Sequence, residues 1–108
     1  MRTQVQRIAF LMRIVPGAEE EYHRRHQAVW PEMLAELRAA GCHNYSIFRD
    51  GLQLFAYLEV DDLDAYRTYL AKSEVAARWE AQMSDILVRE VDSATGIPRV
   101  LPEAFHLD

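Results

Sequence analysis

The predicted strands of this chain carry apolar side chains on both faces, and this feature constrains the fold most. In the first strand-like segment, Val5 to Val15, apolar residues fall at even and odd positions alike. Successive strand residues point to opposite sides of a sheet, so both sides need cover. The helices of one small chain can cover only one side. We therefore expect a second cover, and a second subunit is its simplest source.

A hairpin is expected around Asp50-Gly51, a dipeptide typical of two-residue turns with positive φ angles. With these two residues as the turn, Arg49 would face Leu52, and the other pairs follow from that register. The expected strands are Asn44 to Phe48 and Leu52 to Val60, with Phe48, Phe55 and Tyr57 on the face that the helices leave open.

One region of helical periodicity lies between the first strand and the hairpin, and another follows the hairpin. The first opens with Glu19, Glu20 and Glu21, which suit the positive end of a helix dipole, and it closes at Gly41. Pro31 cannot donate a backbone hydrogen bond and disfavours helical geometry at the residue before it, so a break is expected between His26 and Pro31. The second segment, Pro31 to Ala40, is expected to turn Met33, Leu34 and Leu37 inward.

The second helical region follows Asp61-Asp62, which can cap a helix, and Ser73 offers another cap within it, so we expect two short helices or one bent one. The tail from Val91 has turn residues and ends in a strand-like run, Ala104 to Leu107. This order of elements is typical of an α+β fold, a ferredoxin-like βαββαβ unit, and two such sheets packed face to face form a dimeric α/β barrel. By length, residues 1–108 are expected to form a single domain.

Charge and cysteine content narrow the function. Seventeen acidic and twelve basic residues give a net charge of −5, which opposes binding to the phosphates of a nucleic acid. The single cysteine, Cys42, excludes an internal disulfide and fits a reducing compartment. The polar N-terminus and the short apolar run from Ile8 to Met12 predict neither a signal peptide nor a membrane span. We expect a cytoplasmic protein that does not bind membranes.

The leading candidate site consists of Tyr22, His26 and Trp30, which are spaced four residues apart. This spacing places side chains on one face of a continuous helix. A phenol and an imidazole so arranged can hold a hydroxylated ligand and move protons, because an unperturbed histidine titrates near ~6.5. The same spacing also suits an aromatic cluster that only packs. His23 and His26 are too few ligands for a metal, so no metal site is expected.

Four separated motifs resemble the L-rhamnose mutarotase family, in order and spacing over nearly the whole chain. They are Glu21-Tyr22-His23-Arg24-Arg25-His26 with Trp30-Pro31-Glu32, then Gly41-Cys42-His43-Asn44-Tyr45-Ser46-Ile47, then Arg78-Trp79 with Met83-Ser84-Asp85, and finally Phe105-His106-Leu107. The resemblance implies a homodimer that interconverts the α and β anomers of a free 6-deoxy sugar without a cofactor.

The same resemblance implies roles for individual residues. His26 matches the proton donor, Tyr22 and Tyr45 match sugar-binding tyrosines, and Trp79 matches the first member of a tryptophan pair. Glu80 stands where the family usually has the second tryptophan. An aromatic plate is thereby exchanged for a carboxylate that accepts hydrogen bonds from hydroxyl groups, which predicts a change in the preferred sugar.

Mutarotation needs an acid at the ring oxygen and an acceptor for the anomeric proton. His26 is the expected acid during opening and the base during closure. The candidates for the acceptor are Tyr22, a water molecule and Glu80. An unshifted tyrosine, with a pKa near ~10, is a poor base at neutral pH, which favours water or the carboxylate. Small dimeric α/β barrels also include cofactor-free oxygenases and haem-degrading enzymes, and a sugar-binding module without turnover would use the same pocket. Oxygen consumption, bound haem, or anomer exchange at the buffer rate would identify these alternatives.

Overall fold

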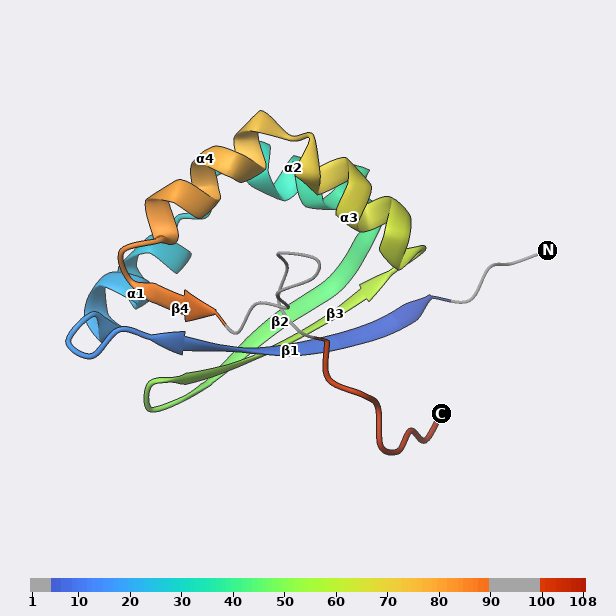
Figure 1. The fold of residues 1–108 in the computed structure, drawn as a ribbon, viewed down its shortest axis with the longest axis horizontal. Coiled ribbons are helices and arrows are strands. Elements are labelled where there is room, and N and C mark those ends of the chain that lie inside the picture. The colour runs from blue at the N-terminus through green and yellow to red at the C-terminus, as the bar shows by residue number, and fades with distance from the viewer. Residues whose placement is uncertain (1–4, 90–99) are drawn as a thin grey trace.

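The computed structural model describes residues 5–89 and 100–108, which form one antiparallel sheet and four short helices (Figure 1). The sheet has the strand order β2-β3-β1-β4. The elements are β1 Gln6–Ile14, α1 Glu19–His26, α2 Pro31–Ala39, β2 Cys42–Asp50, β3 Gln53–Val60, α3 Leu63–Ala71, α4 Glu74–Met83 and β4 Leu87–Arg89. This architecture confirms the predicted mixture of helices with an antiparallel sheet.

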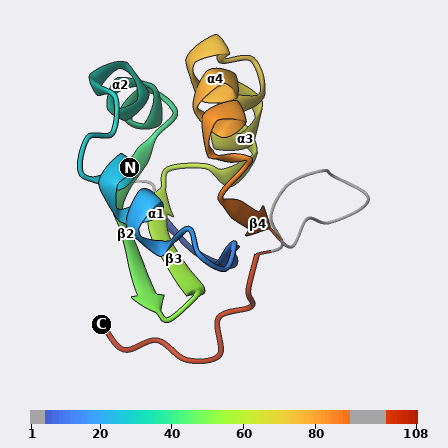
Figure 2. The same cartoon turned by 90° about the vertical axis from the view of Figure 1, so that its left-hand side faces the viewer.

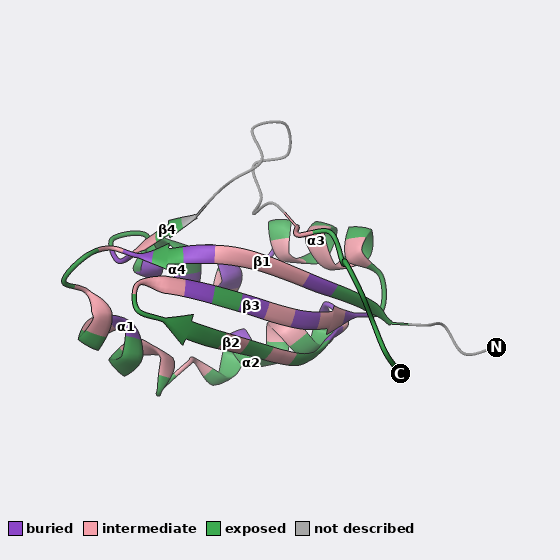
Figure 3. Cartoon of the chain, turned by 90° about the horizontal axis from the view of Figure 1, so that it is seen from below, coloured by how far each residue is buried: buried purple, intermediate pink, exposed green. Residues whose placement is uncertain are grey.

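The helices gather on one side of the sheet, and the C-terminal segment passes along the other side (Figures 1 and 2). Strand β3 shows the consequence most clearly, because buried residues alternate with more exposed ones from Gln53 to Val60. On the helix side, Leu54, Val60 and Met83 are fully buried. On the other side Phe48 and Phe55 stay exposed, and the view from below shows this open face (Figure 3).

Helix boundaries follow the local signals of the sequence. Helix α1 ends at His26, and α2 begins at Pro31 after Trp30, whose φ of −57° and ψ of 133° are not helical. The break predicted from Pro31 is therefore confirmed. Two separate helices follow β3, each with the expected cap: Asp62 accepts a hydrogen bond from the Ala65 amide, and Ser73 accepts one from the Ala76 amide.

The hairpin register differs from the prediction by two residues. Asp50 pairs with Gln53, so the two-residue turn is Gly51-Leu52 and not Asp50-Gly51. Gly51 has a φ of +60° and occupies the first turn position, where a type II′ hairpin turn requires glycine. Because the shift is an even number of residues, the assignment of side chains to faces survives. A bulge between His43 and Ser46 then shifts the register again at the far end of β2.

The last strand is also not the predicted one. Strand β4 precedes the tail and pairs with β1, whereas the run Ala104 to Leu107 has no regular structure. Val100 makes an isolated bridge to Phe10, and the Leu101 amide donates to the carbonyl of Ala9. The turns predicted between 91 and 98 lie outside the described residues. The inward position predicted for Leu34 is wrong, because this side chain is exposed.

Candidate active site

Helices α1 and α4 bring three of the predicted site residues together. Tyr22 and His26 lie one turn apart on α1 and stack with ring centroids 4.1 Å apart. Trp79 of α4 meets the His26 ring edge to face at 5.8 Å and meets the Trp30 ring in the same manner at 5.2 Å. Trp30 therefore joins the cluster from the start of α2 and not from the α1 face on which a continuous helix would have placed it.

The His26 imidazole is held in one orientation by its own helix. Its Nδ1 lies 3.0 Å from the carbonyl oxygen of Tyr22. A carbonyl oxygen can only accept, so Nδ1 carries the hydrogen, and in the neutral ring Nε2 carries the lone pair. Burial lowers the pKa of His26 below its ordinary value, against the smaller opposing effect of this hydrogen bond. Near neutral pH most of the rings are therefore unprotonated.

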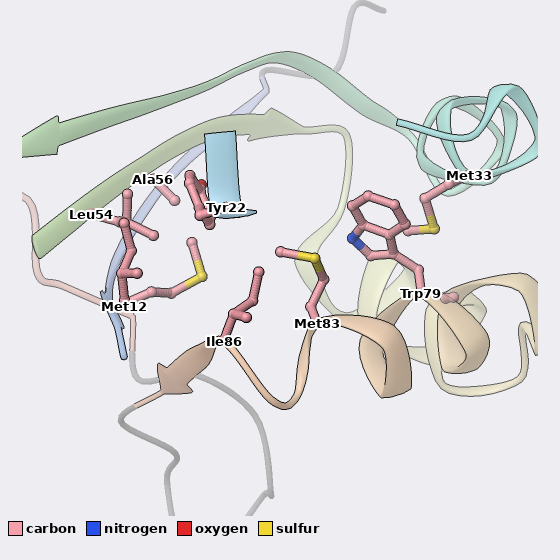
Figure 4. Packing of buried hydrophobic residues seen from close by; sticks show 10 residues of the cluster. Met12, Tyr22, Met33, Leu54, Ala56, Trp79, Met83 and Ile86 are labelled. Atoms are coloured by element: carbon pink, nitrogen blue, oxygen red, sulfur yellow. The ribbon is translucent and has the colours of Figure 1, made fainter. Parts of the chain in front are cut away.

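Tyr22 is the buried residue of α1, packed under the helix against the sheet and close to Met12 and Ala56 (Figure 4). Burial raises its pKa to about 12, with Arg49 opposing the shift. The phenol consequently keeps its proton at neutral pH. It can donate a hydrogen bond to a ligand oxygen, but it is a poor proton acceptor.

Tyr45 and Glu80 lie on the wall of a cavity of about 430 Å³ between the sheet and the helices. Most of the wall is apolar, and its polar members are Tyr45, Tyr66, Arg67 and Glu80. Within the described part of the chain, Tyr22, His26 and Trp79 are not among the lining residues. Tyr22 and Trp79 share neighbours with the cavity, because Met12 and Met33 line it and also belong to the buried cluster that contains these two rings. The five predicted residues thus divide into a lined cavity and an adjoining aromatic cluster.

Two polar residues of the cavity wall were missed by sequence reasoning. Neither Tyr66 nor Arg67 was among the residues expected in the site. Both lie on α3 and reach the cavity, where burial raises the pKa of Tyr66 well above its ordinary value. A search for polar residues beside the apolar stripe of each helix would have found Arg67, since it lies four residues after the cavity residue Leu63.

Other chemistries find no support in the described residues. Among residues 5–89 and 100–108, no three His, Cys, Asp or Glu side chains are placed to hold a metal ion. Cys42 is buried, and burial raises the pKa of its thiol to about 11, so the reactive thiolate is scarce at neutral pH. No helix in the described part of the chain is both long and apolar enough to cross a membrane.

An antiparallel sheet with helices on one face, and a largely apolar cavity beside a buried phenol and an oriented imidazole, define a small α+β protein with a candidate site for a small ligand. The family model described as L-rhamnose mutarotase matches residues 7–107. The chain belongs to the L-rhamnose mutarotase family.

Known proteins similar to this chain carry the same description. An L-rhamnose mutarotase of Oceanobacillus iheyensis is 36% identical over 96% of this chain and the whole of that protein. One from Shigella dysenteriae serotype 1 is 37% identical over 94% of this chain and 97% of that protein. A crystal structure of L-rhamnose mutarotase from Formosa agariphila superimposes with a TM-score of 0.77 at 31% identity, covering 95% of this chain and 99% of that one.

Proposed function

We propose that this protein interconverts the α and β anomers of free L-rhamnose by general acid/base opening and closure of the sugar ring. The observation that carries this proposal is the His26 ring, oriented through Nδ1 by the Tyr22 carbonyl so that Nε2 can exchange a proton with a ligand. The family membership, the similar mutarotases and the adjoining cavity support the same reaction.

The reaction requires only proton transfers. Protonated His26 gives its Nε2 proton to the ring oxygen while the anomeric hydroxyl loses a proton, and the bond between C1 and the ring oxygen breaks. Rotation at C1 presents the other face of the aldehyde, and closure returns the proton to His26. Tyr22 acts as a hydrogen-bond donor, because a pKa of about 12 disqualifies it as the acceptor of the anomeric proton. A water molecule or the Glu80 carboxylate takes that role.

Sugar binding is assigned to residues of both parts of the site. Tyr45 and Glu80 present polar groups from the cavity wall, and Tyr22 and Trp79 contribute from the aromatic cluster. The apolar wall suits the methyl group of a 6-deoxy sugar, because moving an apolar group from water to an apolar surface is favourable. No cofactor takes part in this scheme.

The test is anomer exchange of L-rhamnose measured by NMR saturation transfer between the two anomeric protons. His26→Asn keeps the approximate size and hydrogen-bonding capacity of the side chain, and it is expected to lower exchange by at least ~100-fold, the low end for positioned acid/base catalysis. His23→Asn is the matched control, because His23 lies on the same helix, is exposed and contacts Gln27. Wild-type exchange in the His26 variant would exclude this residue from the mechanism.

We also propose that the protein is a homodimer. We place residues 1–108 in a single ferredoxin-like domain that pairs with a second copy through the open sheet face to form a dimeric α/β barrel in the cytoplasm. Phe48 and Phe55 support this pairing, since they face each other across the β2 and β3 strands and are 65% and 42% exposed. Sedimentation velocity would contradict it if the protein stays a monomer at assay concentrations.

A further inference from the structure

Helix α1 carries two of the site residues but has little means of holding itself in place. It has eight residues, fewer than an isolated helix needs for stability in water, and its N-cap residue Ala18 makes no side-chain capping bond. All eight residues are described, and Tyr22 is the buried one among them. The position of α1, and therefore of His26, must depend on side-chain contacts with the rest of the fold.

Arg25 makes the contacts that join α1 to the end of α4. Its Nη1 donates to the carbonyl oxygen of Gln82 at 2.6 Å and to Oδ1 of Asp85 at 2.9 Å, while Nη2 lies 3.4 Å from Oδ2 of Asp85. On its own helix, Nε donates to Oε1 of Glu21 at 2.7 Å. The guanidinium therefore spans the two helices with bonds in both directions, which the planar fork of arginine allows.

The bond to Gln82 also completes the end of α4. The last carbonyl groups of a helix have no partner within it, and they carry the negative end of the helix dipole. Near the end of α4, the Ser84 amide bonds the carbonyl of Ala81 and the Ile86 amide bonds that of Met83. Arg25 supplies the donor to the carbonyl of Gln82 between them. The cation is thus placed where the helix end attracts it.

The neighbouring Arg24 provides an internal comparison. It pairs with Glu21 of its own helix and its side chain is 73% exposed, whereas the Arg25 side chain is 16% exposed. Exposed pairs within a helix contribute little to stability, because water and salt screen them. The two adjacent arginines share a charge and a partner, but Arg25 alone of the two reaches α4 in the described contacts.

We propose that Arg25 is a positioning residue that holds α1 against the end of α4 and so keeps the His26 ring beside Trp79. The contact of Arg25 with Gln82 lies close to the contact of His26 with Trp79. Gln82 follows Trp79 by three residues on one face of α4, and Arg25 directly precedes His26 on α1. Releasing the clamp lets the His26 end of α1 move away from α4. This inference rests on the proposed function for its effect on rate, although the geometry of α1 is independent of it.

Three variants test the proposal: Arg25→Gln, Arg25→Lys and the matched control Arg24→Gln. Two quantities are measured for each, the kcat and KM of anomer exchange and the pKa of His26 from an NMR titration of its ring protons. A displacement of ~1 Å can cost ~100-fold in rate, so we expect Arg25→Gln to lower kcat by ~10- to ~100-fold with KM within about threefold of wild type. Arg25→Lys keeps the charge without the fork and is expected to fall between Arg25→Gln and wild type.

The pKa of His26 distinguishes a positioning role from a purely structural one, because a change in stability alone would not alter it in the folded protein. Loss of the clamp exposes the His26 ring to water, so its pKa is expected to rise toward 6.5 in Arg25→Gln and to stay at the wild-type value in Arg24→Gln. Wild-type kcat and an unchanged His26 pKa in folded Arg25→Gln would overturn the proposal, as would equal effects in the two Gln variants. If Arg25→Gln does not fold, Asp85→Asn, which keeps the Gln82 bond, is read by the same criteria.

Failure of the proposed function would be recognised separately. Wild-type protein that leaves anomer exchange at the buffer rate would refute the mutarotase assignment. The His26 titration in the Arg25 and Arg24 variants would then still decide whether Arg25 positions the ring.

Discussion

Anomer exchange by this protein is expected to accelerate as the pH falls from 8 toward 5, because the acid form of His26 opens the ring. A histidine with a pKa of 6.5 is about one-quarter protonated at pH 7. Burial lowers the pKa of His26 below that value, so a still smaller fraction carries the proton. The gain in kcat/KM from pH 7 to the acid plateau is therefore at least about fourfold, with its midpoint below pH 6.5.

The assay is saturation transfer on L-rhamnose at each pH, corrected by a blank without protein, since buffers catalyse mutarotation themselves. His26→Asn is the control, and its rate is expected to lose this rise. A midpoint above pH 6.5, or the same midpoint in His26→Asn, would refute the assignment of the acid. The direction of the pKa shift is what makes the result decisive, because an exposed histidine titrates near ~6.5.

Stability is expected to change with pH in the opposite sense to activity. The pKa of His26 is lower in the folded chain than in the unfolded one, so on acidification the unfolded state binds its proton first. The contribution of the neutral His26 ring to the free energy of unfolding is fully present above pH 6.5 and is lost as the pH falls. The slope is at most about 1.4 kcal/mol per pH unit for one proton. Urea midpoints measured at each pH, with His26→Asn flatter, separate this effect from catalysis.

Two further predictions concern substrate choice and the helix caps. Glu80→Trp restores the aromatic plate and is expected to shift the preference among L-rhamnose, L-fucose and related sugars, whereas an unchanged ranking in anomeric exchange would show that position 80 does not select the sugar. Ser73→Ala removes a buried cap for the Ala76 amide together with a bond to Glu36, so urea unfolding should show a loss of about 2 kcal/mol. Asp62, the exposed cap of the Ala65 amide, is the comparison, and Asp62→Ala should cost about 1 kcal/mol. Equal losses in the Ser73 and Asp62 variants would mean that the bond from Ser73 to Glu36 contributes nothing.

Signals that act over a few residues were read correctly from the sequence. Pro31 predicted the end of α1, and Asp62 and Ser73 predicted the starts of α3 and α4. The hairpin was found, but its register was wrong. Asp50-Gly51 and Gly51-Leu52 both place a glycine in the turn, and the choice between them depends on pairing along the strands as well as on local φ angles.

The candidate site was only partly accessible in this way. Spacing brought Tyr22 and His26 together because both lie on one short helix. The family resemblance, and not the spacing, pointed to Tyr45, Trp79 and Glu80. Their roles in binding and the acid role of His26 remain predictions.

Local chemistry was sufficient for the elements, since proline, capping side chains and apolar alternation act on neighbours within about four residues. It was also sufficient to show that the outer sheet face is apolar. Only the folded chain decides which distant residues meet, such as Arg25 with Asp85, sixty positions apart, or His26 with Trp79. The reason is physical: the docking of α1 and α4 on the sheet is a sum of many weak packing contacts, and no single residue type encodes that sum.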